Sequence, residues 1–500
     1  MKFLGLRLCE HDSNITYTDG VKVKYYKSER DLQRKHHGFD NLSSWEYVLK
    51  RWNVTPSEID AVGIVIDADK HEYLQINDTI IHEYLDIPVF EKMGFKCPIH
   101  RIDHHLAHAL SVWPLDEGSH TALVFDGWGD DNLSHSVFWN TERQRAYSND
   151  DCMSLGQIMP HYAGHYMGIE GNPYDFAGKL MALKGFSRML DDQHLLGQLE
   201  CFSIEHINHV WGVYGFEMMD WERRCDYIGL WHEATERIFG KYFASQDALT
   251  ISFSGGVAQN SVLNTAIRNT CALRNKRLVI PPHCSDEGLS LGIVEYLRQH
   301  YQQEEEFDRT GFPFWQDDEA PDSVPTEETI TEVAEMLANG AIVGWYQGQG
   351  EIGSRALGNR SILMNPTLPN GKDIINQRVK HREWFRPFGA SVLEEHVDVY
   401  FKWTDPTPHM LYVADVREPD RFPAISHVDG TSRIQTVDQS HTYYYQLIDK
   451  FNTITGIPMV LNTSLNNNGK PIAGHIQDAV DLLHQSDLDC VVAGNDIIRR

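Results

Sequence analysis

The sequence has no long apolar run. Nowhere in its 500 residues do about 18 apolar residues follow one another without interruption, the length that a membrane-spanning helix needs. Residues 1–10 turn polar early and lack the apolar core of a signal peptide. We therefore expect no membrane partner and a cytoplasmic location.

Cysteine is scarce and scattered. The eight cysteines lie at positions 9, 97, 152, 201, 225, 271, 284 and 490, and none forms a Cys-x-x-Cys pair. Disulfide frameworks and zinc ribbons need paired or clustered cysteines. The sequence therefore argues against both and favours reduced thiols.

Basic residues are few: 44 lysines and arginines face 71 aspartates and glutamates, giving a net charge of −27. So acidic a surface repels a polyanion, and we expect no long nucleic acid as a partner. A small anion in a locally basic pocket is compatible with this balance. The composition is otherwise that of a globular protein, and the length predicts two or three domains.

Two common catalytic motifs are missing. The chain contains neither a Gly-x-Ser-x-Gly elbow nor a phosphate-binding P-loop. This argues against a simple serine hydrolase and against a P-loop kinase.

Two β-turn-β units indicate an internal duplication. Predicted strands at 15–18 and 21–26 flank Asp19-Gly20, which predicts a hairpin with a type I′ turn. Predicted strands at 121–125 and 135–139 flank a polar turn at 126–131. Each unit would begin one half of a duplicated fold.

A glycine turn follows the predicted strand at 249–253. Gly255-Gly256 then leads into a helical pattern, a layout that lets a nucleotide or anion approach the backbone. The alternative is an ordinary strand–helix turn. Asn260 and Asn264 lie one helical turn apart, and a polar surface position would explain both.

The composition changes between residues 304 and 328. This segment holds ten acidic residues against the single Arg309 and predicts a linker or extended arm. Phe312, Phe314 and Trp315 indicate that part of it packs. Thr326 then predicts the cap of a helix whose first turn holds Glu327 and Glu328 and whose end fits Gly340, and we place the boundary near residue 320.

A histidine pair is the first candidate for chemistry. With Asp103 as helix cap, His104 and His108 lie one turn apart on one face. Two imidazoles can bind one divalent cation, but a carboxylate or water must complete the site. Asp126 and Asp286 each follow a predicted strand and could supply it, or each could simply cap a turn.

Basic residues gather in one region of this acidic chain. Residues 351–390 contain seven of them against three acidic ones, interleaved with glycines and aromatics. That pattern predicts a phosphate cradle, although a charge run can also be a solvated face. Further on, the loop that begins at Asn462 could orient a small planar ligand or could be a plain turn.

Taken in order, these segments resemble the O-carbamoyltransferases of the nodulation and antibiotic-biosynthesis type. The resemblance spans nearly the whole chain, and its strongest element is Ser354-Arg355-Ala356-Leu357-Gly358-Asn359-Arg360. The other matching segments are His11-Asp12-Ser13, His104-His105-x-x-His108-Ala109, Asp126-Gly127, Ser154-Leu155-Gly156, Gly178-Lys179-x-Met181, Gly255-Gly256-Val257-Ala258-x-Asn260, Asp286-x-Gly288, Arg386-Pro387-Phe388 and Asn462-Thr463-Ser464-x-Asn466.

The resemblance implies an α/β fold in two parts. Residues 1–303 would form a duplicated Kae1-like domain of the actin/hexokinase (ASKHA) superfold, and residues 304–325 an acidic arm. Residues 326–500 would form a YrdC/Sua5-like α/β domain. In such enzymes the second domain makes carbamoyl-adenylate from carbamoyl phosphate and ATP, with Mg²⁺. The first domain passes the carbamoyl group to a hydroxyl of a small acceptor: a sugar, an antibiotic-like compound or a hydroxymethylated nucleotide. A homodimer is compatible with this organisation.

The resemblance also implies roles for residues. A divalent metal, by expectation Fe²⁺ with Mn²⁺ or Zn²⁺ as alternatives, would be held by His104, His108, Asp126 and Asp286. His11 would act as the base for the acceptor hydroxyl, or would only hydrogen-bond its turn. Asp12, Asp126 and Arg355 would be the other catalytic residues. The residues implied to bind the co-substrates are Gly127, Lys179, Gly255, Gly256, Asn260, Ser354, Arg360, Lys380, Arg382, Arg386, Asn462 and Ser464.

The chain departs from the family pattern in Ala177-Gly178-Lys179-Leu180-Met181-Ala182, which lacks the usual acidic residue before its glycine, and at two further places. Leu465 and Lys470 replace the usual aromatic and acidic residues, which bears on the acceptor contacts more than on the overall reaction. Two other hypotheses compete with this one. A metabolite kinase on the same superfold would leave the C-terminal part unexplained, and a nucleotide-binding scaffold would show no turnover.

Overall fold

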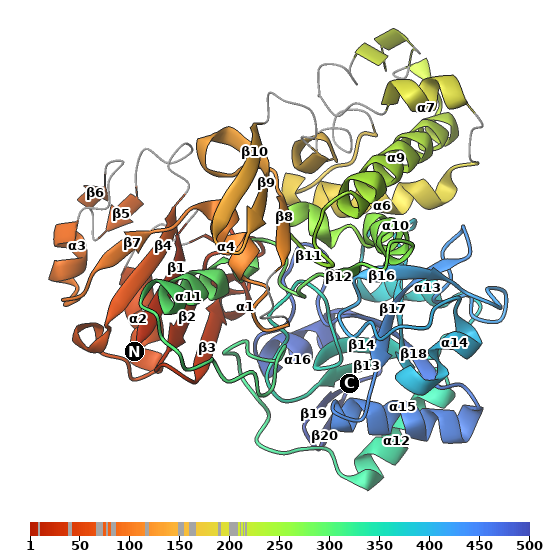
Figure 1. Ribbon diagram of the computed structural model, residues 1–500. Coiled ribbons are helices and arrows are strands. Elements are labelled where there is room, and N and C mark those ends of the chain that lie inside the picture. Colours follow the sequence, from red (N-terminus) through yellow and green to blue (C-terminus); the bar gives the residue numbers. More distant parts are fainter. Residues whose placement is uncertain are drawn as a thin grey trace.

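The computed structural model describes residues 1–8, 11–38, 43–66, 74–76, 79–81, 87–115, 120–148, 155–159, 167–188, 192–199, 209–210, 212–213, 215 and 218–500. Three larger sheets organise them (Figure 1). Two five-stranded sheets belong to the N-terminal part, and an eight-stranded sheet belongs to the C-terminal part, so the fold is mixed α/β.

The two N-terminal sheets repeat one topology. The first has the order β3-β2-β1-β4-β7 and the second the order β10-β9-β8-β11-β12. In each, three antiparallel strands precede two parallel ones, which confirms the internal duplication. The strands are β1 (Phe3–Leu8), β2 (Asn14–Thr18), β3 (Val23–Lys27), β4 (Ala61–Ile66), β7 (Ile99–Arg101), β8 (Thr121–Phe125), β9 (Leu133–Trp139), β10 (Glu142–Ser148), β11 (Thr250–Ser254) and β12 (Arg277–Val279).

The hairpin of β2 and β3 forms, but its turn is not type I′. That turn needs positive φ at both central residues, and of Asp19 and Gly20 only Gly20 has it, at 108°. The Asp19 carboxylate instead accepts the backbone N–H groups of Val21 and Lys22, at 3.1 and 2.8 Å. This side-chain turn satisfies the backbone donors and replaces the predicted geometry.

Helices cover and connect these sheets. The helix α11 packs on β1 and α4, and α9 packs on α10. A small antiparallel pair, β5 (Leu74–Ile76) and β6 (Thr79–Ile81), stands apart. The helices of the N-terminal part are α1 (Ser28–Leu32), α2 (Ser43–Arg51), α3 (Ile87–Lys92), α4 (His104–Leu110), α6 (Phe176–Leu183), α7 (Gln193–Leu199), α9 (Trp221–Ala244), α10 (Ser261–Ala272) and α11 (Leu289–His300).

The C-terminal sheet has the order β16-β17-β15-β18-β14-β13-β19-β20 and encloses the largest apolar core. The predicted helix after Thr326 is present, with the Thr326 hydroxyl accepting the N–H of Thr329. The elements are β13 (Val343–Tyr346), β14 (Arg360–Met364), β15 (Gly389–Leu393), β16 (Tyr412–Asp415), β17 (Thr431–Val437), β18 (Met459–Ser464), β19 (Cys490–Ala493), β20 (Asp496–Arg499), α12 (Glu327–Ala338), α13 (Gly371–Ile374), α14 (Val397–Tyr400), α15 (Thr442–Thr455) and α16 (Ile476–Gln485).

The acidic segment lies against both parts of the chain. Gln316 makes backbone bridges to Tyr25 of β3 and to Gly350, which precedes β14. The indole of Trp52 donates to the Asp317 carboxylate at 2.7 Å. Trp315 is 8% exposed within an apolar cluster, as the aromatic content indicated. The segment therefore ties the first N-terminal sheet to the loop that carries the Ser354–Arg360 motif.

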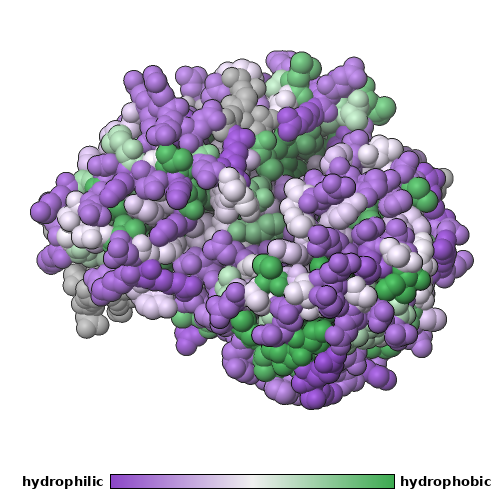
Figure 2. Space-filling model, turned by 90° about the horizontal axis from the view of Figure 1, so that it is seen from below, coloured by the Kyte–Doolittle hydropathy of each residue, from purple (hydrophilic) through white to green (hydrophobic). Residues whose placement is uncertain are grey.

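The face of the molecule seen in Figure 2 is largely hydrophilic, and hydrophobic residues form small groups on it. Among the described residues, none of the helices combines the length and apolarity needed to cross a bilayer.

Candidate functional site

One cavity of about 670 Å³ gathers most of the predicted site residues. Its N-terminal wall comes from the turns after β1 and β8, from the loops after β11 and β12, and from residues 27–36, 155–159 and 173–181. Because the two halves share one topology, the first two are equivalent hairpin turns that face each other. Its C-terminal wall comes from residues 354–356, 380–389, 410, 433 and 462–472.

Four side chains form the His/Asp cluster, defined as His104, His108, Asp126 and Asp286. The Asp103 carboxylate caps α4 by accepting the N–H of Leu106 at 2.8 Å, as predicted. The Nε2 atoms of the two histidines lie 3.2 Å apart. Their distances to the Asp126 Oδ2 atom are 3.0 and 3.3 Å, and to the Asp286 Oδ1 atom 3.5 and 3.3 Å.

The His/Asp cluster is buried and internally compensated. Its side chains are between 0% and 12% exposed. Burial opposes the charge on His104, yet Asp286 and Asp126 raise its pKa to about 10. Burial also opposes ionisation of Asp286, but Arg7, at 2.8 Å, and His104 hold its pKa well below the ordinary range.

The donor set fits a divalent metal. Two imidazole nitrogens and two carboxylate oxygens lie within 4.8 Å of one another. Such a mixed nitrogen and oxygen set suits zinc or a redox-active first-row metal. Metal binding would release the protons that the histidines carry, because ligands must be deprotonated.

Backbone groups orient Asp126 toward the histidines. Its Oδ1 atom accepts the N–H groups of Gly127 and Gly256, at 2.8 and 3.1 Å, which leaves Oδ2 facing the cluster. Gly255 has a φ of 90°, and a Cβ there would lie 2.1 Å from the carbonyl oxygen of Phe125. The glycine pair therefore lets the loop after β11 close on the end of β8.

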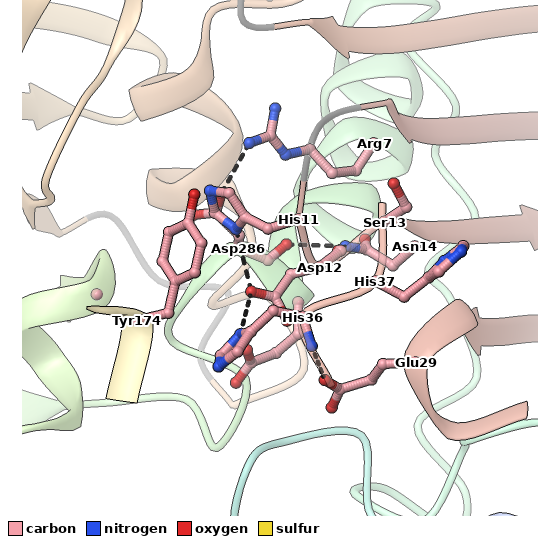
Figure 3. Close-up of polar contacts among 12 residues, drawn as sticks. Arg7, His11, Asp12, Ser13, Asn14, Glu29, His36, His37, Tyr174 and Asp286 are labelled. Carbon is pink, nitrogen blue, oxygen red and sulfur yellow. Dashed lines mark hydrogen bonds and ion pairs between the residues drawn. The ribbon is translucent and has the colours of Figure 1, made fainter. Parts of the chain in front are cut away.

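A second polar network surrounds Asp12 (Figure 3). Asp12 lies in the left-handed region, with a φ of 54°, which aspartate tolerates. Its Oδ2 atom is 3.1 Å from His11 Nδ1 and 3.2 Å from His36 Nδ1. The rings of His11 and Tyr174 lie 4.5 Å apart. His11 thus stands at the cavity between this network and Asp286, 3.9 Å away.

Asp12, Glu29 and His36 also lie close enough to hold a cation. The Lys27 ammonium already occupies that position, 3.2 Å from Asp12 and 3.0 Å from Glu29. Burial opposes its charge, but Glu29 and Asp12 raise the pKa of Lys27 well above its usual range. Of these two groups in the described part of the chain, the His/Asp cluster is therefore the candidate metal site.

The opposite wall carries the cation cradle, defined as Arg355, Lys380, Arg382, Arg386 and Arg433. Arg355 donates to the carbonyl of Gln259 at 3.2 Å, across the cavity from its own loop. Burial, followed by the neighbouring cations, lowers the pKa values of Lys380, Arg382 and Arg433 well below normal. Groups of one sign so close together favour the binding of an anion.

The loop after β18 supports this cradle. Lys380 donates to the backbone oxygens of Ser464 and Asn466, at 2.7 and 2.8 Å, and to the Ser464 hydroxyl at 3.1 Å. The Asn462 amide donates to the Ala356 carbonyl at 3.2 Å. Ser354, Asn462 and Ser464 all line the cavity. The polar loop therefore fixes both the lysine and the segment next to Arg355.

Three predicted co-substrate residues are absent from the cavity wall: Lys179, Gly255 and Arg360. Arg360 is fully buried and donates to four backbone carbonyls and to Asp318. The expected phosphate contact of Arg360 is therefore corrected, since its donors hold its own loop. Lys179 pairs with Glu383 at 2.6 Å, so its side chain is also engaged by protein.

Three further residues of the sequence analysis, Asn260, Asn264 and Ser154, can be compared with the structure. Asn260 lines the cavity and contacts His232 Nε2 at 3.1 Å. The surface interpretation of Asn264 is wrong: it is fully buried and donates to the carbonyls of Ala258 and Leu411. Ser154 lies outside the described residues.

Sequence reasoning missed several cavity residues. Arg433 lies within β17, and Lys27 ends β3, where no motif marks them. For Arg433 the signal was a lone charged residue in an otherwise ordinary strand, whereas β3 also contains Lys24 and gave no such signal for Lys27. Other missed residues of the cavity include Glu29, Lys35, His36, Trp128, Tyr174 and Asp175.

Comparison with known proteins identifies relatives along the whole chain. The family model "Carbamoyltransferase C-terminus" matches residues 334–500. The nodulation protein NolNO of Sinorhizobium fredii is 29% identical over 98% of this chain and 79% of its own length. The protein sll1178 of Synechocystis is 33% identical, over 99% of this chain and 96% of its own length.

Solved structures align more loosely. Full-length HypF in its phosphate- and nucleotide-bound form gives a TM-score of 0.34 at 14% identity, over 59% of this chain and 47% of that one. The sequence relatives and the family model are much more specific. On their evidence, the chain belongs to the O-carbamoyltransferase family of the nodulation type and is a carbamoyltransferase.

Proposed function

We propose that the chain is an ATP-dependent O-carbamoyltransferase that uses carbamoyl phosphate and carbamoylates a hydroxyl of a small acceptor. The observation that carries this proposal is the shared cavity: three members of the His/Asp cluster, namely His104, Asp126 and Asp286, line the same space of about 670 Å³ as the cation cradle. Activation and transfer need an anion site and a transfer site within reach of each other. The family membership supports the group that is transferred.

The cation cradle suits the activation half. Carbamoyl phosphate reacts with water to give carbamate and phosphate, and a carbamate oxygen then attacks the α-phosphorus of ATP. Carbamoyl-adenylate forms and pyrophosphate leaves. Arginine and lysine side chains stabilise the charge on such phosphoryl groups. Arg355, Arg382 and Arg386 are our candidates for these contacts, with Mg²⁺ accompanying ATP.

The N-terminal wall suits the transfer half. The acceptor hydroxyl attacks the carbamoyl carbon, the bond to AMP breaks, and AMP leaves with its oxygen. His11 is positioned by Asp12 at 3.1 Å and is our candidate to accept the hydroxyl proton. A metal held by the His/Asp cluster, by proposal Fe²⁺, would act as a Lewis acid.

We extend the proposal to the division of labour along the chain. Residues 1–303 would transfer the carbamoyl group, and residues 326–500 would be the YrdC-type activating part. Residues 304–325 join them through the contacts of Gln316 and Asp317. The acceptor would be a sugar, an antibiotic-like alcohol or a hydroxymethylated nucleotide.

The full chain tests this with carbamoyl phosphate, ATP and Mg²⁺. We expect pyrophosphate release that requires both substrates, AMP as the nucleotide product, and an acceptor that gains one carbamoyl group by mass spectrometry. Replacing Arg355 by alanine should lower pyrophosphate release about a hundredfold, the typical cost of one charge-stabilising donor. ADP as product would instead indicate a kinase.

The matched control is Arg378→Ala. Arg378 belongs to the same basic region, but its side chain is 62% exposed and faces Asp487 rather than the cavity. It should keep full activity. An Arg355→Ala variant as active as the parent would remove the cradle from the mechanism.

A further inference from the structure

The ion pair between Lys179 and Glu383 joins the two walls of the cavity. Lys179 lies on α6, is 5% exposed, and its Nζ atom is 2.6 Å from Glu383 Oε1. It also donates to the Glu170 carbonyl at 2.8 Å. Other residues of α6 line the cavity, whereas Glu383 lies between Arg382 and Arg386 of the cation cradle. The pair therefore links a wall-forming helix to the cradle segment.

An aromatic contact lies beside this ion pair. The ring of Trp384, the next residue, is 5.3 Å from Phe186 and 5.9 Å from Trp221. Phe186 closes the short helical turn that follows α6. The ion pair and the aromatic rings thus hold the cradle segment against the same part of the N-terminal wall.

The Glu383 carboxylate lies close enough to the cation cradle to neutralise part of its positive charge. It is the sole acidic residue between positions 374 and 393. Its Oε2 atom is 3.7 Å from Arg386 Nη1 and has no hydrogen-bond partner among the described residues. Partial burial opposes its ionisation, but the hydrogen bond from Lys179 lowers the pKa of Glu383. An ionised carboxylate therefore stands within reach of a cation that faces the cavity.

We propose that Lys179 is a positioning residue that keeps Glu383 in its longer, 3.7 Å ion pair with Arg386 and so prevents a closer pairing that would take the Arg386 charge from an anion in the cavity. The inference rests on the proposed function, because the anion is then a phosphate of the co-substrates. It also replaces the expectation that Lys179 binds a co-substrate directly. The lysine acts by neutralising the carboxylate that lies next to Arg386.

The test is calorimetric binding of inorganic pyrophosphate to the full chain, without turnover. In Lys179→Met, Glu383 should pair more closely with Arg386. Pyrophosphate affinity should then fall about tenfold, the value of one charge-assisted contact. In the double variant K179M/E383Q the carboxylate next to Arg386 is gone, so affinity should return to within about threefold of the parent. A lysine that contacts the anion directly predicts that the double variant stays weak, and that result would overturn the proposal.

Two further variants keep the outcome decisive. Arg268→Met breaks the ion pair with Asp405, which also joins the two parts but lies outside the cavity, and it should leave binding unchanged. If K179M does not fold, the reversed pair K179E/E383K keeps both charges and should bind at least as tightly as the parent. Loss of pyrophosphate binding in that variant, or full binding in K179M, would overturn the positioning role of Lys179. If the parent protein binds no pyrophosphate, the proposed anion-binding role of the cation cradle is overturned, and the positioning role of Lys179 with it.

Discussion

The two walls of the cavity treat charge in opposite ways. The His/Asp cluster contains both signs within 4.8 Å, and its members stabilise one another: the pKa of His104 rises to about 10 while that of Asp286 falls. The cation cradle contains one sign, and burial together with mutual repulsion lowers the pKa values of Lys380, Arg382 and Arg433. The charges of the His/Asp cluster therefore compensate one another without a ligand, whereas those of the cation cradle do not.

This difference indicates what each wall binds. A balanced cluster can accept a divalent cation only by releasing its protons, so metal binding should depend strongly on every ligand. A set of like charges is costly when empty and gains free energy from any anion that enters. The comparison therefore separates a cation site from an anion site within one cavity.

The largest effect should come from breaking the cluster. His108 is fully buried with its Nε2 atom among the four donors, and His108→Ala leaves an incomplete set. We expect metal affinity to fall by at least about a hundredfold, since even supporting residues of metal sites cost that much. Elemental analysis after titration with Fe²⁺ or Zn²⁺ measures it.

The control lies on the same helix. His105 is equally buried but hydrogen-bonds Ser136 at 2.8 Å and stands outside the cluster. His105→Ala should therefore retain metal. Equal metal loss in both variants would mean that α4 packing, not ligation, sets the affinity.

A second effect should distinguish the cradle by its pH dependence. Burial and the neighbouring Arg382 and Arg386 hold the pKa of Lys380 well below its ordinary value of 10.5. A bound anion favours protonated Lys380, so its pKa rises on binding and the protein takes up a proton. Anion affinity should therefore fall as pH rises through the pKa of the free protein.

Sulfate is a suitable probe because it carries no proton at neutral or alkaline pH, so a proton taken up on binding goes to the protein. Calorimetry in buffers of different ionisation enthalpy measures the proton uptake. Lys380→Met should abolish the part of the proton uptake that comes from Lys380. Unchanged uptake in that variant would assign the proton to another group.

The smallest effect concerns how the cluster is held. Asp103 caps α4 through the N–H of Leu106, and Asp103→Ala should lower the free energy of unfolding by about 1 kcal/mol. Urea unfolding measures this change. Because α4 carries two of the four cluster residues, we also expect a modest loss of metal affinity.

Thr326→Ala provides the comparison. Thr326 caps α12, far along the chain from the cluster, and its loss should cost about the same stability. Metal affinity should not change. A similar drop in both variants would show that general loosening, rather than the α4 cap, weakens the site.

Local pattern predicted the pieces of this protein well. Spacing placed His104 and His108 on one helical face behind the Asp103 cap, and the structure has that helix. The two β-turn-β units predicted the duplication that brings equivalent turns together. Such features depend on neighbours a few residues apart, which the sequence displays directly.

Which charges face the cavity was decided by tertiary structure. Arg355 and Arg360 belong to one motif, yet only Arg355 lines the cavity, because Asp318 and four carbonyls engage Arg360. Arg433 belongs to the cradle although no motif marks its strand. Lys179 does not line the cavity, because its side chain pairs with Glu383. Long-range partners set these directions: a buried charge turns toward whatever balances it, and that partner can lie anywhere in the chain.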